Sequence, residues 1–519
     1  MESIPKRNIR EDYLSHAEPL RAFYKYTPYE YDIQEIIRDK ASQPLNREAL
    51  HKVLVRQHAD LPTTEKTRQN IEALLQPNTF SFTTGHQLVL WGGPLYTVYK
   101  ILTVIKLAEH YQKLHSDYQF VPVFWVHTED HDFEEINHYY RTFGEKIAYE
   151  VANQGRVGTH LLTEEILTTI PRLAKAYTEA YKPGRSMKAA FMEFMYRLFA
   201  DYGLVLLDPD EPELKQQFTE VIEGELSKQN SYHVISEFSG EMEKAGYPLQ
   251  IHPREVNLFY MVDQVRGRII PEKDVFTVND TDLSFSAEEL LSQAKAQPEN
   301  FSPNVSLRPL YQEMILPNLA YIGGWGELSY WLQLKGIFDY YKVNFPLVLP
   351  RFSALIYRKD QKEAWEKLGL GLAEVEKDLH QLYKDYMPNI WQDTEFHRLG
   401  EELTQSFTAL ETYLRQYSDT LPRSAVGQKV KNDHFLKNMK RKIHRVVRHN
   451  QPSYFNEIEA LKLALQPDRK VQERVLSLDS FHDVDPRDFI KWLWEECDPL
   501  SLRKQYLCLP EELTAKNLS

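Results

Sequence analysis

Cysteine is nearly absent from this chain, which has Cys497 and Cys508 in 519 residues. Two thiols cannot cross-link a protein of this length, and no metal-type CxxC pair occurs, so we expect a reducing compartment. Long apolar runs are also missing. The start of the chain has no hydrophobic segment, and no uninterrupted apolar stretch reaches the roughly 18 residues that a membrane span needs. The sequence therefore predicts a cytoplasmic protein with no membrane partner.

Positive charge is in deficit, because 62 Lys and Arg stand against 75 Asp and Glu, a net charge of −13. This balance argues against a general nucleic-acid-binding protein unless basic charge is concentrated locally. Residues 424–450 are such a concentration, with a single acid, Asp433. They could bind RNA, but the pattern is more typical of the solvated face of a coiled-coil helix with an acidic partner helix. We predict no nucleic-acid partner.

Short apolar runs alternate with helical stretches between residues 79 and 358, which is typical of an α/β core. Residues 92–94 form a turn into a helix that covers residues 95–115. A strand, a helix and a further strand make one right-handed crossover unit. The sequence therefore predicts a doubly wound parallel sheet. Its strands are expected around residues 79–85, 120–126, 204–207, 319–322 and 345–349.

The segments around this core differ in pattern. Residues 1–78 have helical periodicity and are predicted to pack on the core as a lead-in. Residues 230–300 interrupt the core, and the alternating stretch at 256–270 predicts a β-hairpin inside a small inserted subdomain. The tail, residues 452–519, is too short to fold alone and is expected to return to the core.

Residues 359–451 carry apolar side chains at alternating spacings of three and four, which predicts an antiparallel coiled-coil arm with a turn at Leu421-Pro422. A projecting hairpin leaves one side uncovered, so we expect a second copy to cover it in a homodimer. The residues that carry the stripes are Trp365, Leu368, Leu372, Val375, Leu379, Leu382, Leu399, Leu403, Phe407, Leu410, Leu414, Leu436, Met439, Ile443 and Val446.

Polar residues follow the first strand at the edge where an open α/β sheet places its ligand crevice. The loop closes at two glycines before a helix N-terminus, whose free amides favour a phosphate or a carboxylate. The alternative is a tight turn, because neither a Walker lysine nor a GxGxxG motif is present. The candidate binding residues here are Thr84, Gly85, His86, Gln87, Gly93 and Tyr96.

Ionisable residues crowd the end of the second strand. Three interpretations compete for them: zinc or magnesium ligands, acid–base or ribose-binding groups, and an acidic helix start formed mainly by Glu134 and Glu135. We favour acid–base chemistry and substrate hydrogen bonding, and leave Mg or Zn open because no strong metal motif occurs. The catalytic candidates are Asp130, His131 and Asp132, and the binding candidates are His127 and Glu129.

A third cluster surrounds the fourth and fifth strands. Glycine-rich backbone followed by an acid and aromatic side chains suits the wall of a nucleotide or sugar site. A glycine turn that caps core aromatics has equal weight. The candidates for binding are Asn304, Arg308, Gly324, Glu327 and Trp331, with Arg351 and Ser353 after the last strand.

Taken together, these clusters resemble a known enzyme family. TGHQLVLWGGPLYTVYK, VPVFWVHTEDHDFEEINH, SPNVSLRPLYQEMILP, YIGGWGELSYWLQLK, PRFSAL and DRKVQERVLS occur in order between Asp12 and about Glu496. The combination resembles the cysteine ligases of bacillithiol biosynthesis. Members of that family often have Gln at the position of His86 and a second Thr-Gly at the position of Gly92-Gly93.

The resemblance implies a Rossmann-like core similar to class I aminoacyl-tRNA synthetases and a coiled-coil arm associated with dimer formation. It also implies the reaction that joins the carboxylate of L-cysteine to the amine of glucosaminyl-malate. Amide formation from a free carboxylate is uphill in water, so we expect ATP as a co-substrate that activates cysteine as an adenylate. The loop from Gly85 to Gly93 would replace the phosphate-binding signature of the synthetases. Asp130, His131 and Asp132 would orient the amine or accept its proton.

Two other function classes compete with a cysteine ligase. One is a non-catalytic coiled-coil scaffold on a degenerate synthetase-like core, and the other is an RNA-linked synthetase relative. The polar residues after successive strands argue against the scaffold, and the net charge of −13 argues against the RNA-linked form. No KMSKS sequence follows the last core strand, where Arg351-Phe-Ser353 matches by position only.

Overall fold

The computed structural model describes residues 6–140, 145–150, 155–168, 179–262, 265–273, 275–481 and 484–515. The chain divides into two compact units, each described here by itself. The core unit comprises Met1–Ala354, Glu473–Gln505 and Glu512–Ser519, and the helical unit comprises Leu355–Gln472 and Tyr506–Glu511.

A five-stranded sheet lies at the centre of the core unit, in the order β12-β11-β1-β2-β5, with every pairing parallel. The chain leaves β1 toward β2 and β5 on one side and returns to β11 and β12 on the other, so the strand order reverses between β1 and β11. The predicted α/β fold with a parallel-sheet core is confirmed. The strands are β1 (Thr79–His86), β2 (Gln119–Val126), β5 (Val205–Leu207), β11 (Asn318–Gly323) and β12 (Leu347–Pro350).

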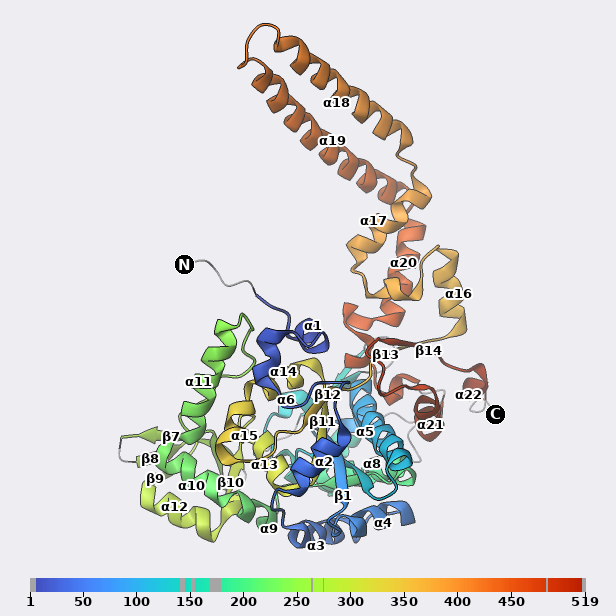
Figure 1. Ribbon diagram of the computed structural model, residues 1–519. Coiled ribbons are helices and arrows are strands. Elements are labelled where there is room, and N and C mark those ends of the chain that lie inside the picture. The colour runs from blue at the N-terminus through green and yellow to red at the C-terminus, as the bar shows by residue number, and fades with distance from the viewer. Residues whose placement is uncertain are drawn as a thin grey trace. The chain divides into compact units, whose positions relative to one another are not determined.

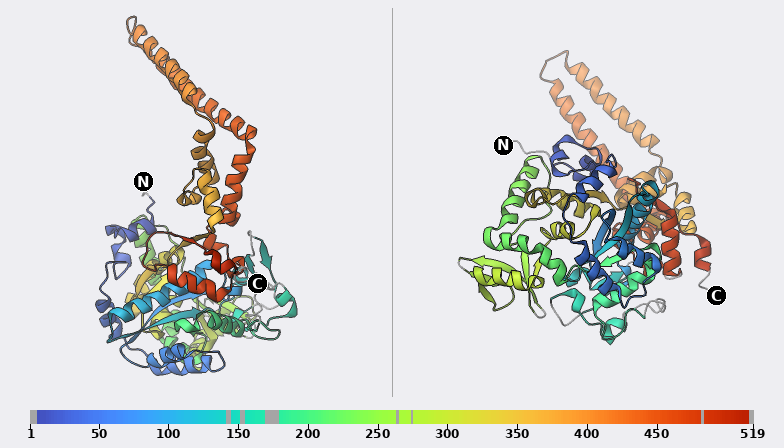
Figure 2. Two further views of the ribbon diagram at one scale, coloured as in Figure 1. Left: turned by 90° about the vertical axis from the view of Figure 1, so that its right-hand side faces the viewer. Right: turned by 60° about the horizontal axis from the view of Figure 1, so that its bottom comes forward.

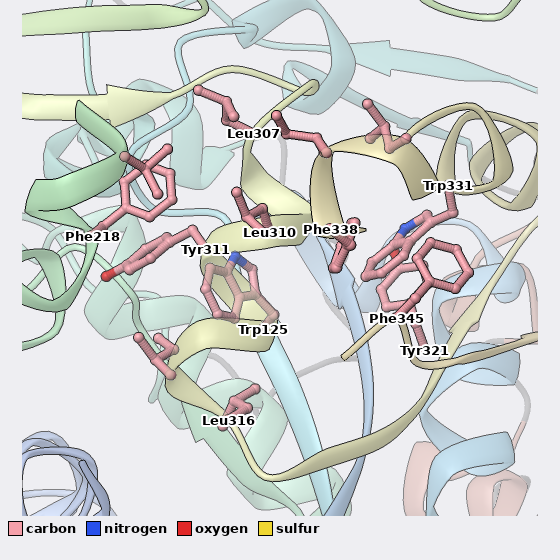
Figure 3. Close-up of a cluster of buried hydrophobic side chains, with 14 of the residues drawn as sticks. Trp125, Phe218, Leu307, Leu310, Tyr311, Leu316, Tyr321, Trp331, Phe338 and Phe345 are labelled. Atoms are coloured by element: carbon pink, nitrogen blue, oxygen red, sulfur yellow. The ribbon is translucent and has the colours of Figure 1, made fainter. Parts of the chain in front are cut away.

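Helices cover both faces of this sheet, which explains why its strands are apolar almost throughout. Successive residues of a strand point to opposite faces. Phe124 of β2 therefore meets Phe191 on one face, with ring centroids 6.0 Å apart, and Trp125 meets Tyr311 on the other at 5.5 Å. Figure 3 shows Trp125 beside Tyr311 in the second of these cores. The helices concerned are α5 (Leu95–Leu114), α8 (Met187–Phe199), α13 (Arg308–Ile315) and α14 (Trp325–Gln333).

The N-terminal segment is helical and belongs to the core unit. The hydroxyl of Tyr13 donates a hydrogen bond of 2.7 Å to the Val348 carbonyl of β12. Arg47 donates to the carbonyls of Leu74 and Thr79, both at 2.9 Å, and so ties α3 to the start of β1. The helices are α1 (Ile9–Leu14), α2 (Ile33–Ala41), α3 (Arg47–His58) and α4 (Glu65–Ala73), coloured blue in Figure 1.

A second, antiparallel sheet lies between β5 and β11 in the sequence, in the order β10-β6-β7-β8-β9. The hairpin expected at residues 256–270 is β6 with β7, and the two residues between these strands lie outside the described residues. Figure 2 shows this sheet at one edge of the core unit. Its strands are β6 (Leu258–Val262), β7 (Val265–Glu272), β8 (Val275–Val278), β9 (Ser284–Ser286) and β10 (Phe301–Pro303), and its neighbouring helices are α10 (Thr219–Lys228), α11 (Asn230–Lys244) and α12 (Ala287–Ala296).

Short elements complete the core unit, and α21 returns to it from the C-terminal part of the chain. Lys106 of α5 donates a 2.7 Å hydrogen bond to the Trp494 carbonyl of α21. No helix among the described residues is long and apolar enough to cross a membrane. The short elements are α6 (Phe133–Ile136), β3 (His138–Tyr140), β4 (Lys146–Ala148), α7 (Glu164–Thr168), α9 (Pro212–Lys215), α15 (Lys335–Tyr341), α21 (Pro486–Glu496) and α22 (Glu511–Ala515). Strand β13 (Ala354–Tyr357) pairs with β14 (Gln505–Cys508), and most residues of both strands belong to the helical unit.

The helical unit contains an antiparallel hairpin of two long helices, α18 (Thr394–Leu414) and α19 (Pro422–Asn450), which lie side by side in Figure 1. The predicted turn is present, because α19 begins at Pro422. The other helices of this unit are α16 (Lys359–Lys367), α17 (Leu379–Ile390) and α20 (Pro452–Leu465).

The apolar stripe from Trp365 to Leu382 is not part of the coiled coil, contrary to the sequence expectation. The helix stops after α16 because Gly369 adopts a left-handed φ of 72°. Trp365, Val375 and Leu382 instead pack with residues of α20 in a small separate core. Accordingly, residues 452–472 lie in the helical unit, and only residues 473–505 and the last residues of the chain belong to the core unit.

Candidate active site

A cavity of 1260 Å³ lies at the carboxyl ends of the central strands, where the strand order reverses. Loops after β1, β2, β11 and β12 line one part of it, and the inserted antiparallel sheet lines another. The structure thus brings together most residues that the sequence singled out. Those in the lining are Gly85, His86, Gln87, Tyr96, His127, Glu129, Asp130, His131, Asp132, Asn304, Arg308, Gly324, Glu327 and Arg351.

Four candidates lie outside the cavity lining and have structural contacts. Thr84 donates a 2.8 Å hydrogen bond from its hydroxyl to the Ile322 carbonyl of β11. Gly93 has a φ of 65°, and a Cβ there would collide with Val89. Trp331 stacks on Tyr321 with centroids 4.3 Å apart, as Figure 3 shows, and the Ser353 hydroxyl donates to Glu473 at 2.6 Å.

The loop after β1 presents a neutral histidine to the cavity. His86 Nε2 lies 2.8 Å from the Tyr96 hydroxyl. Burial, helped by the charge of Lys100, lowers the pKa of His86 to about 3. The backbone amide of Leu95 donates to the Leu476 carbonyl at 2.7 Å, so the first amide of α5 already has a partner within the protein. The cavity side of this loop is therefore Gly85 to Gln87, rather than the glycines at 92 and 93.

Lys100 is a site residue that the sequence reasoning missed. Its ammonium group lies 2.5 Å from Glu327 Oε2 and donates to the Gly85 carbonyl at 3.1 Å. Burial raises the pKa of Glu327, but Lys100 and the Gly324 amide outweigh it and hold that pKa at about 2. Lys100 lies one helical turn after Tyr96, so both residues share one face of α5, and this spacing could have identified Lys100 from the sequence. The pair fixes the end of β1 to the start of α14.

Asp130 connects the central sheet to the inserted sheet. Its carboxylate accepts hydrogen bonds from Gln87, from the His131 amide at 2.8 Å and from Arg266 Nη1 at 3.2 Å. Burial alone would raise the pKa of Asp130, but His131, Arg266 and Gln87 together hold it well below its usual range. A carboxylate stabilised in this way is a weak proton acceptor. This geometry fits a clamp on Arg266, while the predicted catalytic role of Asp130 stays a prediction.

Arg266 of β7 is the other half of this clamp, and it too was missed. Its side chain is 6% exposed, and its guanidinium also donates to Ser302 at 3.0 and 3.1 Å and to the Pro303 carbonyl at 3.2 Å. The guanidinium lies over the ring of Phe259 at 4.0 Å. Arg266 thus joins β7, β10 and the loop after β2.

The other residues after β2 differ in their contacts: some are bound within the protein, and one is exposed to solvent. Glu129 is paired with the buried ammonium group of Lys215, which also donates to the Phe301 carbonyl at 3.0 Å. His131 accepts from Arg266 at 2.6 Å, and its ring lies 5.1 Å from that of Phe259. Asp132 is exposed and makes no side-chain cap at the start of α6.

Glu135, for which a helix start was one of the competing interpretations, lies in the first turn of α6 and also lines the cavity. Glu135 is exposed on one side, but partial desolvation at the cavity wall raises the pKa of its carboxyl, and the negative charges of Asp132 and Asp130 raise it further. A carboxylate with a raised pKa is a better proton acceptor near neutral pH than an ordinary one. Glu135 is therefore a candidate general base of this cluster.

The third cluster contributes a turn and a buried cation. Asn304 uses its amide within the protein, because its Nδ2 donates to Asn257 at 2.8 Å and its Oδ1 accepts from the Ser306 amide at 2.8 Å. Arg308 is 7% exposed and points among aromatic rings. Arg351 donates to Glu473 at 2.6 Å and lies 5.5 Å from the ring centroid of Tyr96.

Basic side chains from the inserted sheet, from the segment just before its strand β6 and from the late part of the chain also line the cavity. These are His252, Arg254, Arg268 and Arg474. Sequence reasoning could not find them, because the crevice rule inspects strand ends of the parallel sheet and these residues come from elsewhere. Among the described residues no three His, Cys, Asp or Glu side chains gather in a metal-binding arrangement.

Comparison with protein families assigns both parts of the chain. Residues 1–352 match the model described as "Bacillithiol biosynthesis BshC, N-terminal Rossmann-like domain", and residues 354–509 match its C-terminal coiled-coil domain. The chain belongs to the BshC family. The family resemblance drawn from the sequence motifs is thereby confirmed, as are the Rossmann-like core and the coiled coil of this BshC protein.

Three relatives share the BshC name across nearly their whole length. The protein of Cytophaga hutchinsonii is 36% identical, over 96% of this chain and 95% of its own. Those of Flavobacterium johnsoniae and Christiangramia forsetii are 35% and 33% identical, over 95% and 96% of both chains. Each is named "Putative cysteine ligase BshC". This BshC protein is accordingly a ligase with a role in bacillithiol biosynthesis.

Proposed function

We propose that this protein joins the carboxylate of L-cysteine to the amine of glucosaminyl-malate, with ATP as the activating co-substrate. The names of the relatives support the cysteine part of this proposal. The observation that carries it is the 1260 Å³ cavity at the reversal of strand order, which combines a proton acceptor, Glu135, with cationic side chains from several elements. An amide-forming site requires both kinds of group.

The reaction divides into two balanced steps. In the first, a carboxylate oxygen of cysteine attacks the α-phosphorus of ATP, and pyrophosphate leaves, so that a mixed anhydride with AMP is formed. In the second, the sugar amine attacks the carbonyl carbon, the bond to AMP breaks, and the amine loses a proton. Site residues need only hold the reactants in line, stabilise negative charge and accept that proton.

In this scheme Glu135 accepts the proton of the attacking amine. Its raised pKa suits the task, whereas the carboxylate of Asp130 is committed to Arg266 and Gln87. The neutral ring of His86 makes a hydrogen bond through Nε2 with the Tyr96 hydroxyl beside the same cavity, and it adds no charge there. Cys497 and Cys508 lie outside the cavity lining, so a protein thiol has no part in the scheme.

The test is an assay with purified protein, L-cysteine, glucosaminyl-malate and ATP, in which thiol product, AMP and ADP are measured together. We expect one AMP for each product molecule. ADP in place of AMP would show an acyl phosphate instead of an adenylate, and no product from a folded protein would favour the non-catalytic scaffold.

We further propose that the hairpin of α18 and α19 forms a homodimer. Exposed apolar side chains occur along both helices, and a monomer rarely leaves so many without a partner. They include Leu399, Leu403, Leu410, Val426, Val430, Phe435 and Val446. Light scattering should give twice 61.2 kDa for the full chain. Val430→Glu with Phe435→Glu should give folded monomers, and a micromolar monomer of the unmodified protein would contradict the proposal.

A further inference from the structure

Arg308 is a buried cation without a carboxylate partner. Its side chain is 7% exposed, and Nη1 donates to the neutral amide oxygen of Gln312 at 3.0 Å. The guanidinium also interacts with the neutral Tyr330 hydroxyl, but Nη2 is buried and makes no hydrogen bond of good geometry within the described part of the protein. The guanidinium lies 5.6 to 5.9 Å from three ring centroids, those of Trp125, Tyr321 and Trp331. These rings, which Figure 3 labels, attract a cation but do not neutralise it.

Glu327, the cavity-lining acid whose charge acts on Arg308, is already engaged. Glu327 pairs with Lys100 at 2.5 Å, and it also accepts from the Tyr321 hydroxyl at 2.5 Å and from the Gly324 amide at 2.8 Å. The charge of Glu327 acts on both Lys100 and Arg308, but its close ion pair is with Lys100, so Arg308 has no carboxylate of its own. An uncompensated buried charge is costly, so proteins keep one chiefly where a ligand supplies the opposite charge.

His127 adds an unpartnered polar atom to the same wall. Its Nε2 is buried and has no hydrogen-bond partner among the described residues. Burial, followed by the charge of Arg308, lowers the pKa of His127 to about 3. The ring is therefore neutral and can donate one hydrogen bond to an oxyanion without requiring a second negative charge. Gly85 provides room for it, since a Cβ there would lie 3.0 Å from Nε2.

We propose that Arg308 and His127 form a binding subsite for a substrate oxyanion, with Arg308 supplying the charge and His127 a neutral donor. The planar guanidinium suits a carboxylate or a phosphate, which share this chemistry. The ligation proposed above supplies three sources, and the inference rests on it for their identity: the carboxylate of L-cysteine, the phosphates of ATP and the carboxylates of malate.

Arg308→Met and Arg47→Met form a matched pair of variants for the test. Arg47 is also partly buried, but it donates to two backbone carbonyls and therefore has a structural role. A cation kept for a ligand costs stability in the free protein, so Arg308→Met should have a urea midpoint equal to or above that of the wild type. Arg47→Met should lower the midpoint and leave ligand affinities unchanged.

The binding measurement is calorimetry of the full chain with L-cysteine, ATP and L-malate as separate probes, and with cysteamine as a cysteine without a carboxylate. We expect Arg308→Met to weaken one of the three anionic probes at least tenfold and His127→Phe to weaken the same probe. If Arg308→Met weakens the binding of L-cysteine but not of cysteamine, the subsite binds the amino-acid carboxylate. Weaker binding of ATP would assign the subsite to a phosphate, and weaker binding of L-malate would assign it to the malate carboxylates of the sugar conjugate.

Equal affinities for every probe in Arg308→Met and wild type would overturn the subsite, as would a fall in its urea midpoint like that of Arg47→Met. The outcome is separable from that of the ligation assay. A wild-type protein that ligates while Arg308→Met binds every probe normally refutes the subsite alone. Probe binding that depends on Arg308 in a protein without ligation refutes the proposed reaction alone.

Discussion

Replacement of Asp130 by Asn should destabilise the junction between the central and inserted sheets. The change removes the negative charge opposite Arg266, whose side chain is 6% exposed, whereas Asp130 is 25% exposed. Removing one partner of a buried ion pair costs about 3–5 kcal/mol, and partial access of water to Asp130 places this case near the lower end. We therefore expect the free energy of unfolding of the core unit to fall by about 3 kcal/mol.

Asp132→Asn is the matched control, because Asp132 is exposed two residues away and its substitution should change stability by no more than about 0.5 kcal/mol. The assay is urea unfolding at neutral pH, combined with hydrogen exchange of β7 and β10, which Arg266 joins to Asp130. Exchange in these strands should accelerate in Asp130→Asn only. A double-mutant cycle with Arg266→Met should give a coupling of about 1–3 kcal/mol.

The pH dependence has a definite sign. The folded-state pKa of Asp130 lies below its unfolded value, so its contribution is present above about pH 4 and is lost as the pH falls toward the folded pKa. The difference between wild type and Asp130→Asn should therefore be constant from about pH 5 to 8 and shrink in acid. Equal stability of Asp130→Asn and Asp132→Asn at pH 7 would refute the clamp.

Two further predictions concern the cavity wall. The pKa of Glu135 is raised and the base must be ionised to act, so the ligation rate should increase with pH through that pKa. Glu135→Gln should lose this dependence on the acidic side of the pH–rate profile, while its stability at neutral pH is retained or raised. An unchanged pH–rate profile would remove Glu135 from the reaction. Gly85→Val should displace His127, because a Cβ at residue 85 would lie 3.0 Å from both His127 Nε2 and the Trp125 carbonyl. We expect substrate affinity, measured by calorimetry, to fall at least tenfold. Unchanged affinity would show that the loop is only a turn.

The central sheet could be predicted from the sequence because its strands are buried on both faces. Val121, Val123 and Trp125 face one core and Phe124 the other, so the whole run is apolar. The polar residues directly after these strands then follow from the crevice rule for open α/β sheets. This rule found His86, His127 and Arg351 at one cavity, although they lie at the ends of three different strands and far apart in the chain.

The rest of the site depends on tertiary contacts that have no local signature. In the sequence, Arg266 is one polar residue of a hairpin in which apolar and polar residues alternate. Only the packing of β7 against the loop after β2 brings it to Asp130. Likewise, the 3–4 spacing from Trp365 to Leu382 is shared by coiled coils and by small helical cores. Gly369 and Gly371 decide between them, because Gly369 ends α16 with a positive φ and Gly371 starts the next helical turn.

The most direct test of the account separates activation of cysteine from ligation in one variant. Cysteine-dependent exchange of labelled pyrophosphate into ATP reports the first step without the amine, and thiol product reports both steps. Glu135→Gln should retain the exchange within about threefold and lose ligation at least hundredfold, the typical size of a general-base effect. Ligation at the wild-type rate, or equal loss of exchange and ligation, would contradict the assignment of Glu135 as the base that receives the amine proton in this cavity.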